Sequence, residues 1–232
     1  MAQWSFQRSS GPTPVSIGWV GEGRLGADFS QIAARYDLLN RLLSLGQEQN
    51  WRRRGAAYLP AGRILDLGSG TGAAAPIFGD SDLVALDPEP RMLDLSPIRR
   101  RVIGVGEHLP FRDASFDGVF SAYVFRNVDS VPATLSEVNR ILRPGGRAVI
   151  IDLTRPRNAQ LAKVHRVGTS VVLPVAGATV GGREEYQFLH ESLDKLPPPE
   201  ALYARTPMSV VDMWRMGPLG FVYGAVLART PG

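Results

Sequence analysis

The chain carries Arg63-Ile64-Leu65-Asp66-Leu67-Gly68-Ser69-Gly70-Thr71-Gly72, in which the apolar residues of a buried strand run into a turn with three glycines. Glycine has no Cβ, so main-chain N–H groups of such a turn can approach a ligand that any side chain would hold off. A second apolar run, residues 83–86, ends in Asp87, at the position where a doubly wound sheet places an acid on ribose hydroxyls. The two runs predict neighbouring strands whose ends form a site for a nucleotide-like ligand.

The spacing of the glycines narrows the ligand. Dehydrogenases that bind a pyrophosphate carry Gly-x-Gly-x-x-Gly, whereas this chain has Asp-x-Gly-x-Gly-x-Gly from Asp66 to Gly72, followed by a short helical segment that contains Pro76. A dinucleotide is therefore the weaker interpretation. The pattern resembles motif I of class I S-adenosylmethionine-dependent methyltransferases, in which the glycines pack against the methionine part of the cofactor and the later acid holds its ribose. A tight strand-to-helix turn without a ligand is the alternative.

Composition excludes several other classes. The chain has no cysteine, so it has no disulfide, thiol nucleophile or cysteine-ligated zinc. Its three histidines, His108, His165 and His190, lie far apart in the sequence, and we expect no metal. The formal charge is only +4, and the basic clusters at 52–54 and 99–101 are not interleaved with aromatic residues. We interpret both as solvated helix faces rather than a nucleic-acid surface, with contact to anionic lipid as a separate alternative.

The 232 residues suit one α/β domain with additions. Residues 1–27, rich in Gly, Ser and Pro, predict a flexible N-terminal arm, and residues 28–232 predict the domain itself. Its first part, 28–60, has apolar residues at helical spacing and is expected to form a lid. Predicted strands follow at 64–67, 83–86, 101–105, 118–122, 148–153, 209–213 and 221–228. We expect an α/β fold with a doubly wound, mostly parallel seven-stranded sheet and an antiparallel last strand, because a short link joins the last two strands.

Residues 155–199 form an insert between the fifth and sixth predicted strands, a position from which inserts commonly cover an active site. Most of its aliphatic residues, Val164, Val167 and Val171 among them, are expected to pack on the sheet, and some to line a substrate cavity. The segment before the last hairpin, 197–207, is rich in proline and predicts only a short helix.

Several motifs together resemble those of the ubiquinone/menaquinone biosynthesis C-methyltransferases. They are Tyr36-Asp37-Leu38-Leu39-Asn40, Trp51-Arg52-Arg53, Leu109-Pro110-Phe111, Arg126-Asn127-Val128 and the run from Glu185 to Leu193. The resemblance covers about residues 28 to 195, and the first and fourth motifs carry it most specifically. It implies an S-adenosylmethionine-dependent methyltransferase that acts on a ring carbon of a demethylated menaquinol or ubiquinol precursor and releases S-adenosylhomocysteine.

The resemblance also implies roles for individual residues. Arg126 and Asn127 would lie beside the reaction centre, where the arginine stabilises a phenolate or holds a water that takes the proton. Asp87 would bind the cofactor ribose, and Tyr36 would close over the site. Further cofactor-binding positions are expected at Asp66, Gly68, Ser69, Gly70, Thr71, Gly72, Pro88, Gly106, Glu107, His108 and Ala122, and substrate-binding positions at Tyr186 and His190. The alternatives are a loop cap for Arg126, a turn for Asn127, core packing for Tyr36 and solvent exposure for His190.

Two positions depart from the family pattern. Ala73 and Val105 stand where the family usually carries an acid that contacts the cofactor. Loss of two good hydrogen bonds would weaken binding by about 1–3 kcal/mol, unless neighbours such as Glu107 and His108 compensate. Three hypotheses follow: a quinol C-methyltransferase, a methyltransferase of the same fold with another small acceptor, and a non-catalytic partner subunit.

The sequence also gives expectations about location and partners. The apolar stretch 171–180 is short and broken by Pro174 and Gly177, so we do not expect it to span a bilayer. The N-terminus has neither the basic start nor the apolar core of a secretory signal. We expect a cytoplasmic protein that takes a small lipophilic quinol and touches the inner face of the membrane peripherally, without nucleic acid as a partner. A homodimer is a further alternative.

Overall fold

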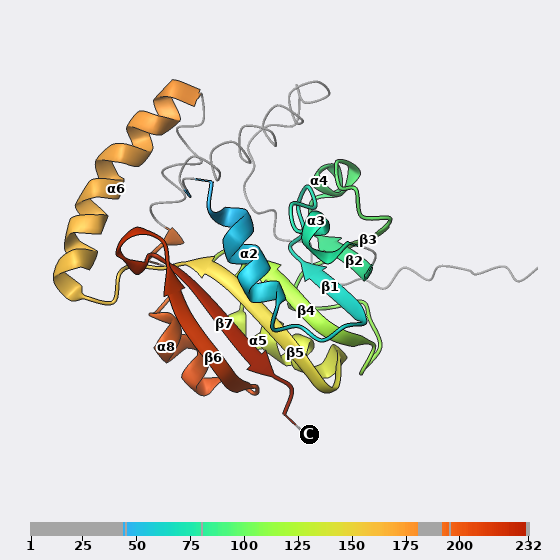
Figure 1. Ribbon diagram of the computed structural model, residues 1–232. Coiled ribbons are helices and arrows are strands. Elements are labelled where there is room, and N and C mark those ends of the chain that lie inside the picture. The colour runs from blue at the N-terminus through green and yellow to red at the C-terminus, as the bar shows by residue number, and fades with distance from the viewer. Residues whose placement is uncertain (1–43, 45, 80, 181–191, 195, 231–232) are drawn as a thin grey trace, which may run out of the picture.

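The computed structural model contains the predicted sheet. It describes residues 44, 46–79, 81–180, 192–194 and 196–230. Within these residues seven strands form one sheet in the order β3-β2-β1-β4-β5-β7-β6 (Figure 1). The strands are β1 Arg63–Leu67, β2 Asp82–Asp87, β3 Arg100–Ile103, β4 Phe116–Ala122, β5 Leu142–Leu153, β6 Ser209–Met216 and β7 Val222–Ala228. All pairs are parallel except those of β7, which is antiparallel to β5 and β6. The predicted fold class is confirmed.

Several strand boundaries differ from the prediction, among them the end of β3 and the start of β5. β3 ends at Ile103 rather than at 105, although the N–H of Gly104 still donates to the carbonyl of Asp87 at 3.2 Å. β5 begins at Leu142 rather than at 148, because Leu142 already pairs with Phe116 before the Pro-Gly-Gly turn, and the register shifts before Gly118. The turn at residues 144–146 therefore lies inside an irregular strand.

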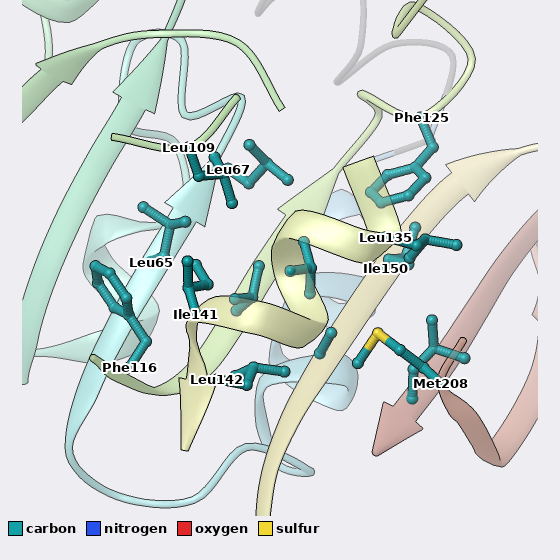
Figure 2. Packing of buried hydrophobic residues seen from close by; sticks show 14 of the residues in the cluster. Leu65, Leu67, Leu109, Phe116, Phe125, Leu135, Ile141, Leu142, Ile150 and Met208 are labelled. Atoms are coloured by element: carbon teal, nitrogen blue, oxygen red, sulfur yellow. The ribbon is translucent and has the colours of Figure 1, made fainter. Parts of the chain in front are cut away.

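Helices cover both faces of the sheet, because successive side chains of the central strands point to opposite sides. In β5, Ala148 and Ile150 join one buried cluster, and Val149 and Ile151 join the other. The first cluster packs against the helix α5 Val131–Ile141, as Figure 2 shows for Leu135 and Ile141. The second lies under α2 Glu48–Ala56, to which Trp51 belongs. Both faces of the central strands are therefore buried. The loops that form the site begin at the ends of these strands.

The remaining helices are short, with one exception. They are α3 Ala75–Phe78, α4 Pro90–Asp94, α8 Pro199–Leu202 and the 3₁₀ turns η1 Tyr203–Arg205 and η2 Pro218–Gly220. The short helix predicted in the proline-rich segment before the last hairpin is thus confirmed as α8 and η1. The exception is α6 Ala159–Val180, which extends along one side of the molecule in Figure 1.

The expectation that the valines of the insert pack on the sheet is wrong for three of them. On α6, Val164, Val167 and Val171 are 63%, 67% and 60% exposed. Between residues 159 and 171 only Ala162, His165 and Thr169 are half-buried. These three lie at spacings of three and four, so the first half of α6 touches the protein along one narrow line.

Arg155 makes the polar contacts along that line. Its guanidinium lies 3.3 Å from Nδ1 of His165, donates to Thr169 at 3.0 Å and pairs with Asp194 at 2.7 Å, and His165 stacks on Phe221. Polar contacts therefore hold this part of α6, while its aliphatic face stays exposed.

Candidate functional site

The glycine turn after β1 is held by its own hydrogen bonds. The N–H groups of Gly68 and Ser69 donate to the carbonyl of Leu86 at 2.8 and 3.0 Å, and that of Gly72 donates to Ser69 at 2.9 Å. These main-chain donors are therefore used inside the protein, and the expectation that they face a ligand is wrong for them. A Cβ on Gly70, which has φ +54°, would meet only the terminal methyl group of Met92, at 3.8 Å. At this position the turn offers close approach to a ligand.

Asp66 organises the turn from inside the sheet. Its carboxylate accepts a hydrogen bond from the Ser69 hydroxyl at 2.7 Å, and burial raises the pKa of Asp66 to about 6. Asp66 is 3% exposed, so it supports the turn from within the protein. Thr71, also predicted to bind the cofactor, is half-buried in the same turn.

Asp87 joins the ends of β2 and β1. One carboxylate oxygen accepts from the N–H of Gly70 at 2.9 Å, and the other accepts from that of Glu89 at 3.0 Å. Burial raises the pKa of Asp87, and these two backbone hydrogen bonds oppose the rise. A carboxylate accepts more than one hydrogen bond on each oxygen, so Asp87 can hold the turn and still accept a hydrogen bond from a ligand hydroxyl. Pro88, which follows it, is exposed.

The loop after β3 uses its polar groups differently from the prediction. Glu107 accepts hydrogen bonds from the N–H groups of Asp129 and Ser130 at 2.8 and 3.1 Å, and so fixes the start of α5. His108 is exposed, and Gly106 lies so close to Thr134 that a Cβ would meet its methyl group at 2.8 Å. Compensation for Val105 by Glu107 or His108 stays a prediction that no described contact supports. Val105 itself is 43% exposed.

Arg126 forms a buried ion pair. Its guanidinium donates to Asp152 at 2.5 Å, and its backbone N–H donates to the other carboxylate oxygen at 3.1 Å. The side chains of Arg126 and Asp152 are 5% and 1% exposed. The pair joins the loop after β4 to the end of β5, so part of the role of Arg126 is structural, as the alternative interpretation held. Sequence reasoning missed Asp152, although it lies within an apolar run as Asp66 does.

Asn127 makes a turn and leaves one polar atom without a partner. Its backbone N–H donates to the carbonyl of Val124 at 2.7 Å. Its side-chain oxygen is buried, and no hydrogen-bond partner for it exists among the described residues. Ala122, at the end of β4, is half-buried. A buried amide oxygen without a partner is costly unless a ligand or water completes it.

Arg52 of α2 also reaches this edge of the sheet. Its guanidinium lies 5.1 Å from the ring centre of Tyr123 and 4.0 Å from Glu48, and the residue is 7% exposed. The interpretation of cluster 52–54 as a solvated face is therefore wrong for Arg52. In the cluster 99–101, Arg100 and Arg101 belong to strand β3, so the interpretation as a helix face is wrong for both, whereas the strand predicted from 101 is confirmed. Sequence reasoning missed both Arg52 and Tyr123 as residues of this edge.

Some predicted positions lie outside the described residues: Tyr36, Tyr186 and His190. Within residues 44–230 as far as they are described, no three His, Asp or Glu side chains gather as a metal site. In the same part of the chain no helix is long and apolar enough to cross a membrane.

Solved structures share this fold. A SAM-dependent methyltransferase from Thermotoga maritima superposes with a TM-score of 0.57 at 18% identity, covering 87% of this chain and 96% of that one. Another from Aquifex aeolicus gives 0.54 at 18% identity, covering 86% and 98%. The sheet order, the glycine turn after β1 and the acid at the end of β2 are those of the class I methyltransferase fold.

The chain belongs to the ubiE/COQ5 methyltransferase family, whose model matches residues 19–206. The demethylmenaquinone methyltransferase of Thermus thermophilus is 38% identical over 192 residues, which cover 76% of this chain and 87% of the relative. That of Deinococcus radiodurans is 40% identical over 190 residues, covering 75% and 79%. The ubiquinone/menaquinone biosynthesis C-methyltransferase UbiE of Geotalea uraniireducens is 36% identical over 194 residues, covering 76% and 83%. The family resemblance found in the sequence is confirmed.

Proposed function

We propose that this enzyme transfers the methyl group of S-adenosylmethionine to a ring carbon of a lipophilic quinol, with a demethylated menaquinol as the first substrate to test. The observation that carries this proposal is the similarity to the two demethylmenaquinone methyltransferases, at 38% and 40% identity over about three quarters of the chain. A ubiquinol precursor is the second substrate of the same chemistry, since the UbiE relative carries both quinones in its name.

The residues around the glycine turn fit S-adenosylmethionine. We assign the ribose to Asp87, whose half-buried carboxylate stands at the end of β2, and the methionine part to the open side of the turn at Gly70. Asp66, Ser69 and Thr71 would act by holding that turn in shape. Contributions from Tyr36 and Ala122 remain part of the proposal.

When bound, the cofactor supplies an electrophilic methyl group. A hydroquinone becomes nucleophilic at its ring carbon when one hydroxyl loses a proton, and a carbon–carbon bond then forms while the carbon–sulfur bond breaks. The ring proton leaves afterwards to restore the aromatic ring. Near-attack positioning of two reactants can contribute roughly 7–11 kcal/mol, so the main task of the residues at the strand ends is to hold the quinol in line.

We propose Arg126 and Asn127 as the groups that orient the quinol oxygens. Asp152 balances the charge of Arg126 and fixes its position, so the arginine contributes a directed hydrogen bond rather than an unpaired charge. The side-chain oxygen of Asn127, buried without a partner in the described part of the chain, can accept a hydrogen bond from a quinol hydroxyl. Tyr186 and His190 complete the proposed acceptor side.

We further propose that the protein is cytoplasmic and touches the membrane peripherally to reach such a substrate. The exposed face with Val164, Val167 and Val171 on α6 supports this, because Lys163 and Arg166 are exposed on the same helix and residues 159–180 contain no acidic residue. An interfacial helix combines apolar residues with such basic ones. A second copy of the chain covering the same face is the alternative.

Calorimetric titration with S-adenosylmethionine and S-adenosylhomocysteine, followed by turnover of demethylmenaquinol, tests the proposal. Micromolar binding with methylation of the quinol ring supports it. Binding without quinol turnover would favour another small acceptor, and no binding to a folded protein would favour the non-catalytic alternative, with Ala73 and Val105 as the decisive departures.

A further inference from the structure

Tyr123 has an unusual backbone conformation at the edge of the site. It follows directly after β4, and its φ is +67°. Bulky residues rarely adopt a left-handed backbone conformation. Where they do, the strained residue often belongs to a functional site. The backbone is held there by the N–H of Tyr123, which donates to the carbonyl of Ile151 at 2.7 Å. The fold therefore imposes one fixed direction on this side chain.

The hydroxyl of Tyr123 is buried and has no hydrogen-bond partner within the described part of the chain. The other tyrosines that the structure describes do not share this property. Tyr203 and Tyr223 pair their hydroxyls at 3.0 Å, and that of Tyr58 donates to Asp212 at 2.5 Å. A buried phenol without a partner destabilises the fold relative to phenylalanine. A residue that adds such a cost to backbone strain fits a group that awaits a ligand.

Charges of both signs surround this hydroxyl. Arg52 lies 5.1 Å from the ring centre. Arg52 and Arg126 favour ionisation of the phenol electrostatically, whereas Glu48 and Asp152 oppose it. Burial outweighs these contributions and raises the pKa of Tyr123. The phenol therefore stays protonated at neutral pH, and its O–H group can donate a hydrogen bond.

We propose that the Tyr123 hydroxyl binds the acceptor by donating a hydrogen bond to a ring oxygen of the quinol. A quinol oxygen gains negative charge as the ring carbon becomes nucleophilic, and a neutral donor fixed in a buried place stabilises that charge. Arg126 and Asn127, which the proposed function assigns to the same oxygens, follow Tyr123 within four residues of chain. Val124, which follows Tyr123, lies close to Gly68 of the glycine turn, so cofactor affinity has to be measured together with acceptor turnover. This inference rests on the proposed function.

Tyr123→Phe in the full-length protein tests the inference, because it removes one oxygen atom and leaves the ring. We expect kcat/KM for demethylmenaquinol to fall about tenfold, affinity for S-adenosylhomocysteine to stay within about twofold, and Tm to stay equal or rise. The matched control is Tyr203→Phe, which removes a hydroxyl that does have a partner and is expected to lower Tm.

Three results would overturn the inference. One is an unchanged kcat/KM in Tyr123→Phe while the wild type methylates the quinol. Another is a loss of S-adenosylhomocysteine affinity with unchanged acceptor kinetics, which would assign the hydroxyl to the cofactor. The third is a fall in Tm equal to that of Tyr203→Phe, which would show a partner within the fold. A wild-type enzyme that binds S-adenosylmethionine but methylates no quinol refutes the proposed function itself, and the inference with it.

Discussion

The two halves of the site differ in how their polar groups are satisfied. At the ends of β1 and β2, Asp66 bonds Ser69, and Asp87 bonds the backbone of Gly70. At the ends of β4 and β5, the hydroxyl of Tyr123 and the side-chain oxygen of Asn127 are buried without partners among the described residues. The β1–β2 half, which we propose as the cofactor half, is thus a turn held by its own hydrogen bonds. The β4–β5 half, which we propose as the acceptor half, leaves these polar groups unsatisfied, and selectivity for one acceptor can arise there.

The buried pair Arg126–Asp152 is expected to give the largest effect on stability. Asp152→Asn leaves the arginine buried without its counter-charge, so the free energy of unfolding should fall by about 3–5 kcal/mol. Urea unfolding at neutral pH measures it. Asp82→Asn is the control, since its pair with Arg100 is exposed and should contribute at most about 1 kcal/mol. Equal losses in the two variants would contradict a structural contribution of the buried pair.

Asp66 should make stability depend on pH in the opposite direction to an ordinary salt-bridged acid. Its pKa is raised to about 6 by burial, so the stability that protonated Asp66 contributes is present at about pH 4 and lost as the pH rises through 6. A shift of about two units corresponds to about 3 kcal/mol. Unfolding of the wild type and of Asp66→Asn between pH 4 and 8 measures the difference. A difference that is flat, or that grows with pH in favour of the wild type, would sink the idea.

Much of the cofactor half could be predicted from the sequence, whereas the acceptor half could not. Asp66 lies two residues before Gly68 in an apolar run, and Asp87 ends an apolar run before Pro88. This local pattern is enough to place both. The pairing of Arg126 with Asp152 depends on the register in which Ala122 lies beside Ile151, which no local pattern contains. The positive φ of Tyr123 is equally invisible, because tyrosine has no preference for it.

The insert shows a different limit of sequence reasoning. Val164, Val167 and Val171 lie on α6, but the sequence does not say what they pack against. The contacts that hold the first half of α6 are those of Arg155 with His165, Thr169 and Asp194. These contacts join residues that are far apart in the sequence. The sequence alone therefore could not show that the valines stay outside the core.

The affinity of an Asp87 variant for the cofactor tests the proposed cofactor half more directly than a measurement of stability does. Asp87→Ala removes the proposed ribose contact and the acceptor for the N–H of Gly70, so affinity for S-adenosylhomocysteine should fall by about 2–3 kcal/mol, roughly 30- to 150-fold. Calorimetric titration measures it, with Glu89→Ala as the control for the neighbouring charge. Arg126→Ala should spare this affinity and remove turnover. Retained affinity in Asp87→Ala would refute the ribose assignment.

Substitutions at two glycines of the turn distinguish a role in ligand binding from a role in folding. Of the predicted effects on stability, that of Gly70→Ala is the smallest. Gly70→Ala should lower stability only by the backbone cost of about 1–2 kcal/mol, because its Cβ meets nothing closer than Met92 at 3.8 Å, yet it should weaken cofactor binding as the methyl group fills the approach. Gly72→Ala meets the Ser96 hydroxyl and Pro97, so it should lose more stability with no direct effect on a ligand. Thermal unfolding and titration of both variants check the contrast. If Gly70→Ala kept full affinity, the methionine part would have to bind elsewhere, because a Cβ at residue 70 would then stand where the proposal places the cofactor.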